Sequence, residues 1–217
     1  MNFERTRGLS WPAHRFTEVI LVLALLLGGC ATSMNKIADA NQPLTASEGI
    51  VVGSVLVRVG KINIPLPFPV SASLLRPARS IGYSLEVGVP RDIRSIMEKP
   101  IAIDKQFLLN IEPDEEKIFV TRMPAGPHVF DRLVPRGYEE AATLLGIRFS
   151  VAPGTTTYIG RVIFDLPEKL PLLLPQGFYS LKFTTQVEDA QEATIDSIRS
   201  THSRIVENVV KDLMRAE

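Results

Sequence analysis

The alternation of apolar and polar residues in several short segments is the feature that most constrains how this chain folds. The segment YSLEVGV, residues 83–89, places aromatic or aliphatic side chains at every second position, with Ser, Glu and Gly between them. Successive side chains of a strand point to opposite faces, so this pattern predicts a strand with one buried face. The same period-two pattern recurs at residues 51–59, 107–111, 147–151 and 179–183.

Turn-forming residues separate these segments. EPDEEK, residues 112–117, combines a proline that fixes φ with an aspartate that favours turns, so we predict a hairpin between residues 106–111 and 117–122. MPAGPH at 123–128 and APGTT at 152–156 supply further turns. Seven to eight short strands separated in this way predict a mainly β chain that folds as an antiparallel β-sandwich over residues 48–187.

The last part of the chain, residues 188–217, has a helical period instead. Apolar residues and one histidine recur there at steps of three and four: Ile195, Ile198, His202, Ile205, Val209 and Leu213. Acidic residues lie at the start of this stretch, and Lys211 and Arg215 lie near its end. This is the charge distribution that the helix dipole favours. We therefore predict a C-terminal amphipathic helix that lies on the sandwich or pairs with another chain.

The apolar run LVLALLLGGC, residues 21–30, ends at the only cysteine of the chain. It is too short for a membrane span, which needs about 20 apolar residues, and with the arginines before it the run predicts a signal peptide over residues 1–29. Leu27 to Cys30 resembles the bacterial lipobox, which implies cleavage before Cys30 and attachment of acyl chains, palmitate among them, to that residue. The alternative is an unmodified Cys30 behind an ordinary signal peptide.

The resemblance to lipoproteins also implies a location in the cell. Residues 30–47 are small and polar, which favours a flexible tether between the lipid and the domain. No aspartate follows Cys30, which implies the outer membrane of the bacterial envelope, on its periplasmic or surface face. The acylated thiol of Cys30 is then neither a nucleophile nor a metal ligand.

Charge excludes one class of partner. Residues 1–29 hold three arginines and two glutamates, and without them the chain has 21 Lys and Arg against 22 Asp and Glu. Nucleic-acid binding depends on a basic face, so we expect no nucleic-acid partner. Motifs for nucleophilic, phosphoryl-transfer and dinucleotide chemistry are absent from the sequence, and we expect neither a cofactor nor an enzyme.

Few residues are candidates for chemistry. His128 and Asp131 stand three apart on a predicted strand, so their side chains are expected to diverge. His202 lies on the apolar stripe of the predicted helix and is interpreted as a buried structural residue. The carboxylates of residues 114–116 are expected to form a solvated turn, because the loop is too short to encircle calcium. These residues predict no metal site and no catalytic residues.

Two segments combine prolines with large apolar residues: IPLPFPV at 64–70 and LPEKLPLLLPQGF at 166–178. Proline excludes them from a central strand. They either fold over the ends of the sandwich and close its core, or project as apolar tips toward a membrane or a partner. In the second case the candidate interaction surface consists of Phe68, Leu170, Leu172, Leu173 and Leu174.

A longer stretch carries a second resemblance. RMPAGPHVF followed by FSVAPGTTTYIGRVIF, at about Met123–Phe164, resembles the strand and turn pattern of carboxypeptidase-regulatory-like and prealbumin-like sandwich domains. Within it, TYIGRVIF is apolar on both faces, as in a central strand. The resemblance implies binding or support and brings no catalytic residues.

The expected function is therefore that of a lipid-anchored, non-enzymatic binding or assembly module of the envelope, with an envelope protein as its partner. One alternative is an enzyme, or a subunit of one, that acts on envelope polymers, for which Glu139 or Glu140 would have to enter a cleft. Another is a carrier that holds an apolar ligand inside the sandwich.

Overall fold

The computed structural model describes residues 43–63, 71–90, 103–172 and 181–216, all within the compact unit Thr32–Glu217. Eight strands of five residues or more lie in the described part: β1 (Glu48–Val59), β3 (Tyr83–Pro90), β4 (Ile103–Ile111), β5 (Lys117–Pro124), β6 (Gly126–Pro135), β7 (Thr143–Val151), β8 (Thr156–Leu166) and β10 (Thr184–Glu188). Shorter elements are β2 (Arg76–Pro77), β9 (Lys169–Leu170), β11 (Val209–Lys211), the helix α2 (Gln191–Arg199) and 3-10 turns at Ala72–Leu74, Ala78–Ser80 and Glu139–Ala141. None of the helices in these ranges is long and apolar enough to cross a bilayer.

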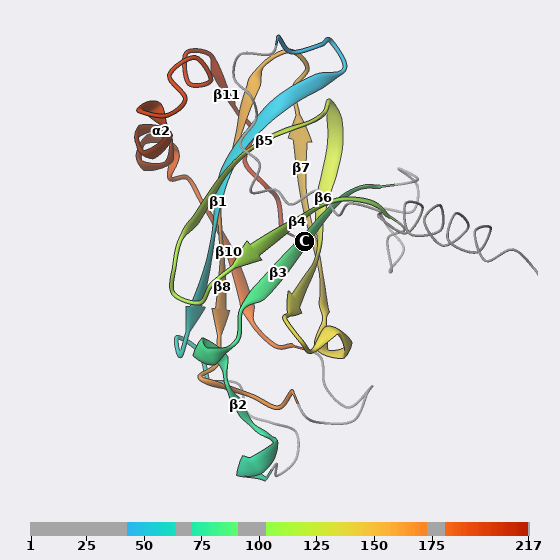
Figure 1. Cartoon of the computed structure of the whole chain (residues 1–217), viewed down its shortest axis with the longest axis vertical. Helices are drawn as coiled ribbons and strands as arrows, with labels where there is room; N and C mark the ends of the chain where they lie inside the picture. Colours follow the sequence, from blue (N-terminus) through green and yellow to red (C-terminus); the bar gives the residue numbers. More distant parts are fainter. Residues whose placement is uncertain (1–42, 64–70, 91–102, 173–180, 217) are drawn as a thin grey trace, which may run out of the picture. The chain divides into compact units, whose positions relative to one another are not determined.

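The long strands form two sheets (Figure 1). One has the order β10-β8-β1-β5, with β11 also paired to β8, and the other has the order β4-β3-β6-β7. Pairing is antiparallel except between β1 and β8 and between β11 and β8, which are parallel. The prediction of a mainly β chain in two sheets is confirmed, with mixed rather than purely antiparallel pairing.

The inner faces of the two sheets share one core. The predicted apolar faces lie in it, and these side chains are at most 5% exposed: Val51, Val55, Val57, Val59, Tyr83, Leu85, Val87, Leu109, Ile111, Ile147, Phe149 and Val151. Phe119 of β5 meets Phe130 of β6 edge to face at 6.3 Å between ring centroids, so the core is continuous between the sheets. β8 lies between β1 and β10 and is buried on both faces, as its sequence predicts.

The predicted hairpin between residues 106–111 and 117–122 is wrong. β4 pairs with β3 and β5 pairs with β1, so the connecting residues 112–116 cross from one sheet to the other. The loop is tied to the end of β1, because Asp114 adopts a φ of 59°, its N–H donates to Val57 O at 2.7 Å and its Oδ1 accepts from the Val59 N–H at 3.0 Å. These bonds favour an arch over a hairpin.

The predicted strand at residues 179–183 is misplaced. Residues 181–183 are not in a strand, and β10 begins at Thr184; residues 179 and 180 lie outside the described ranges. Leu181 is nevertheless buried, and Phe183 packs edge to face on Phe164 at 5.4 Å. The apolar pattern therefore marks core contact here without strand pairing.

The predicted helix over 188–217 is also wrong in its second half, since α2 ends at Arg199. Residues 200–203, Ser-Thr-His-Ser, include side chains that compete for backbone hydrogen bonds, and the β-branched Val209 and Val210 join the edge of β8 instead. Ile195, Ile198 and Ile205 pack with Ile50, Val52, Val120 and Tyr158 as a second apolar cluster. The apolar stripe thus covers the outer face of the larger sheet, as one alternative predicted (Figure 1).

Candidate functional site

The described ranges include two of the five residues of the candidate interaction surface. They do not include the lipidation candidate. Cys30, Phe68, Leu173 and Leu174 lie outside the described residues. Leu170 and Leu172 are core residues, 0% and 8% exposed, and β9 is held against β2 by the pairing of Leu170 with Arg76. For these two leucines the structure agrees with the alternative in which the segment closes the core, and not with the alternative of an exposed interaction surface.

His128 occupies the inner face of β6. Its Nε2–H donates to Pro124 O at 2.8 Å, and its ring stacks on Phe149 with the centroids 5.4 Å apart. Burial lowers the pKa of His128, against the opposing effect of the bond to Pro124. Nδ1 is buried with no hydrogen-bond partner, so the neutral imidazole acts as a core side chain.

Asp131 has other partners. Its Oδ2 lies 3.3 Å from Arg132 Nε, and Arg132 Nη2 also donates to Glu86 Oε2 at 2.6 Å. His128 and Asp131 therefore do not form a pair, as the sequence predicts. The carboxylates of Asp131 and Glu86, which are buried beside one arginine, form a structural ion-pair cluster.

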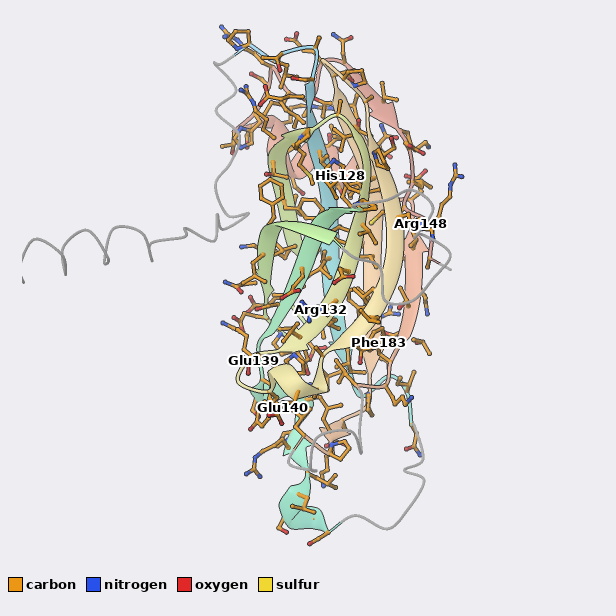
Figure 2. The ribbon with its side chains drawn as sticks, turned by 90° about the vertical axis from the view of Figure 1, so that its right-hand side faces the viewer. His128, Arg132, Glu139, Glu140, Arg148 and Phe183 are labelled. Atoms are coloured by element: carbon orange, nitrogen blue, oxygen red, sulfur yellow. The ribbon has the colours of Figure 1, made fainter. Side chains whose placement is uncertain are left out.

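The remaining sequence candidates are structural or exposed. His202 is 9% exposed and lies one turn after Ile198, whose carbonyl accepts the His202 N–H at 2.8 Å. Glu139 and Glu140 are exposed on their short turn, at the end of the sandwich away from His128 (Figure 2). Neither glutamate lines either of the two cavities described below.

Arginines neutralise the acidic turn at residues 114–116. Arg79 Nε lies 2.8 Å from Asp114 Oδ2, and Arg161 donates to both oxygens of Glu116 at 2.9 Å. Among the described residues no cluster of three or more His, Cys, Asp or Glu side chains is placed to hold a metal ion. The turn is a set of ion pairs on the surface.

An open groove of about 650 Å³ lies beside α2. Its lining is Asp189, Ala190, Gln191, Glu192, Ala193, Ile195, Asp196, Arg199 and Lys211. Four of its five charged side chains form ion pairs, with Lys211 Nζ 2.8 Å from Asp189 Oδ2 and Arg199 Nη1 2.9 Å from Asp196 Oδ1. The Lys211 ammonium holds the pKa of Asp189 below its usual value.

A smaller cavity of about 320 Å³ lies where the described chain begins. Pro43 and Leu44 line it together with Gly154, Thr155 and Ile205. The Ala125 N–H donates to Ser47 O at 2.8 Å, so the last residues of the predicted tether are part of the domain. Residues 43–47 thus lie at the end of the sandwich where β1 begins (Figure 1).

Sequence reasoning missed a buried acid on the outer face of the larger sheet. Asp165 of β8 is 3% exposed and accepts two bonds from Arg58 of β1, at 2.6 and 2.8 Å, and a third from Gln186 at 3.2 Å. The bond to Asp165 raises the pKa of Arg58. The fully satisfied carboxylate has a structural role, and no local signal reveals it, because its partner is 107 residues away.

Comparison with known proteins adds little. No protein-family model and no curated protein matches the chain. The solved structure of the T6SS lipoprotein TssJ1 from Pseudomonas aeruginosa matches 65% of this chain and 98% of its own, at 8% identity and a TM-score of 0.24. A likeness this slight assigns neither a family nor an activity. The resemblance of Met123–Phe164 to carboxypeptidase-regulatory-like and prealbumin-like domains stays a prediction.

Proposed function

We propose that the chain is a lipid-anchored protein of the bacterial outer membrane that acts as a non-enzymatic binding or assembly module. The observation that carries the proposal is the apolar run of residues 21–30, which ends in two glycines and the only cysteine. More than one acyl chain on Cys30, each contributing about 0.8 kcal/mol per buried methylene, anchors a protein stably, whereas one chain does not.

The position of Pro43 supports one end of the sandwich as the end nearer the anchor. Twelve residues separate Cys30 from Pro43, the first described residue. The end of the sandwich that carries Pro43 and the turn Ala152–Thr155 would then face the bilayer, and the end that carries β2 and β9 would face away (Figure 1).

A non-enzymatic role is supported by the state of the described titratable groups. Asp165, Glu86 and Asp131 are buried beside arginines, and the Nε2–H of His128 is bonded to a backbone carbonyl. Glu139 and Glu140 are exposed and line neither of the two cavities. The alternatives of an envelope-polymer enzyme and of an apolar-ligand carrier gain no support from the described residues.

Replacement of the anchor residue tests the proposal. Wild-type chain is expected in the outer-membrane fraction with acylated Cys30 at its N-terminus, as read by mass spectrometry of the mature product. Cys30→Ser should leave that fraction and lack the acyl mass. Ser33→Ala, in the tether, is the matched control and should behave as wild type. Retention of a normally processed Cys30→Ser variant in the outer membrane would contradict the proposal.

A further inference from the structure

The smaller cavity, of about 320 Å³, lies on the same side of the larger sheet as α2 (Figure 1). Ile50 of β1 and Thr156 of β8 are paired in register and form its floor. Residues 204, 205 and 208, which follow α2, line one side, and residues 43 and 44 line another. Its volume is at the lower end of the range of ligand pockets, about 300–1,000 Å³.

Three polar side chains of this cavity have no partner within the described part of the chain. Arg204 is exposed and forms no ion pair, unlike both basic residues of the groove beside α2. The amide of Asn208 and the hydroxyl of Thr156 are not hydrogen-bonded either, although Thr156 is only 5% exposed. A polar group that is almost buried without a partner is unfavourable, so these groups are available to a ligand.

The charge of the cavity selects an anion. Among the nine described residues that line it, Arg204 is the only charged one, so an anion meets no carboxylate there. A guanidinium, an amide and a hydroxyl are all hydrogen-bond donors, and phosphate oxygens accept such bonds readily. The polar side of the cavity therefore fits a phosphate group.

The rest of the lining is largely apolar. Ile50 and Ile205 are 6% and 4% exposed, and Leu44 packs beside them in the second apolar cluster. Inorganic phosphate would use none of this surface, whereas the glycerol and the first methylenes of a lipid would leave water against it. The combination of Arg204 with this apolar wall favours an amphiphile over a free anion.

We propose that this cavity binds the phosphate head group of a membrane phospholipid, with Arg204, Asn208 and Thr156 as donors to its oxygens. The proposal rests on the proposed function, because Pro43 lines the cavity and only twelve residues separate it from Cys30. A site with one guanidinium is weak by itself. The anchor raises the local concentration of head groups, so that a weak site is occupied at the bilayer.

Titration with a soluble lipid tests the site. The chain from residue 30 onward includes the whole compact unit Thr32–Glu217, and Cys30→Ser removes its only thiol. The probe is dihexanoyl phosphatidylglycerol below the concentration at which it forms micelles. We expect saturable shifts of the amide resonances of Thr156 and Asn208, and an affinity for inorganic phosphate at least about tenfold weaker. Absence of saturation, or equal affinity for the two probes, would overturn the proposal.

Two variants separate the polar and apolar contacts. Arg204→Gln should weaken binding of the lipid at least about tenfold, because a charged hydrogen bond is lost. Arg199→Gln, in the groove beside α2, is the matched control and should bind as wild type. Leu44→Ser should weaken binding of the lipid and leave that of inorganic phosphate unchanged. Equal affinity of Arg204→Gln and Arg199→Gln for the lipid would contradict the proposal.

Hydrogen exchange on vesicles tests the site at a bilayer. The acylated protein, with its acyl mass verified, is bound to vesicles of phosphatidylglycerol or of galactosyl diacylglycerol, which has no phosphate. The amide of Asn208 should exchange at least about threefold more slowly on the phospholipid, and that of Val55 in β1 equally on both. Equal rates for Asn208 would overturn the proposal. The soluble titration does not depend on acylation, so its failure is distinguishable from a failure of the Cys30→Ser fractionation.

Discussion

Arg58 and Asp165 face each other across the parallel pair β1–β8 and form two hydrogen bonds of 2.6 and 2.8 Å. The side chain of Asp165 is 5% exposed and that of Arg58 is 31% exposed, so the acid is removed from water while the arginine remains partly at the surface. A pair of this kind couples the two central strands of the larger sheet on the face away from the core.

Removal of the negative charge should therefore destabilise the domain. Asp165→Asn leaves the partly buried Arg58 without its counter-ion, and we expect a loss of about 1–3 kcal/mol in the free energy of unfolding, below the range for a fully buried pair. Urea denaturation monitored by circular dichroism measures it. Glu140→Gln, at an exposed glutamate, is the control and should change the stability by less than about 0.5 kcal/mol. Equal midpoints for the two variants would contradict a structural role of Asp165.

Leu170 should behave as a core residue. Leu170→Ala leaves a cavity at a fully buried position, so we expect a loss of about 2–5 kcal/mol in the free energy of unfolding. Leu144, which is 44% exposed, is the matched leucine, and Leu144→Ala should cost less than about 1 kcal/mol. Denaturant unfolding compares the two variants. A loss of stability for Leu170→Ala as small as that for Leu144→Ala would contradict the core position of Leu170.

The buried His128 predicts a loss of stability in mild acid. Burial lowers its pKa in the folded state, so the unfolded chain binds a proton at a pH where the folded chain does not. The contribution of neutral His128 is complete above the unfolded pKa of about 6.5 and declines as the pH falls from there toward the lower folded value, by at most about 1.4 kcal/mol per pH unit.

His128→Gln tests this pH dependence, since glutamine keeps a donor for Pro124 O and does not titrate. Urea unfolding between pH 7.5 and 5.5 should show a shallower decline for the variant than for the wild type. Parallel curves would mean that His128 does not contribute to the pH dependence.

The hydroxyl of Tyr158 should stabilise the N-terminal end of α2. It accepts the Ala190 N–H at 2.8 Å, and burial raises the pKa of the phenol. Tyr158→Phe leaves that N–H without its acceptor, so we expect a loss of about 1 kcal/mol and faster amide exchange in residues 190–194. The amide exchange rates in β1 and β8 should keep the ratio that they have in the wild type. Unchanged protection of the Ala190 amide would contradict this role of the Tyr158 hydroxyl.

Some of this architecture is readable from local patterns. Alternation at residues 51–59 and 83–89 predicts strands with one buried face, and both lie in the core as predicted. The pattern fails where the apolar residues are anchored without a strand, as at Leu181 and Phe183, and where a helical period continues past Arg199 into a turn and β11. Periodicity reports which side of the chain is buried, and several backbone conformations satisfy the same burial.

The sequence by itself determined the likeness of residues 21–30 to a lipoprotein signal, the mainly β character and the inner faces of most strands, because these depend on neighbouring residues. Only the tertiary structure decided that β4 and β5 belong to different sheets, that Arg58 meets Asp165, and that Met214 enters the core. Backbone hydrogen bonds pair any two strand edges almost equally well. The choice of partner depends on the packing of side chains far apart in the chain, which no local pattern contains.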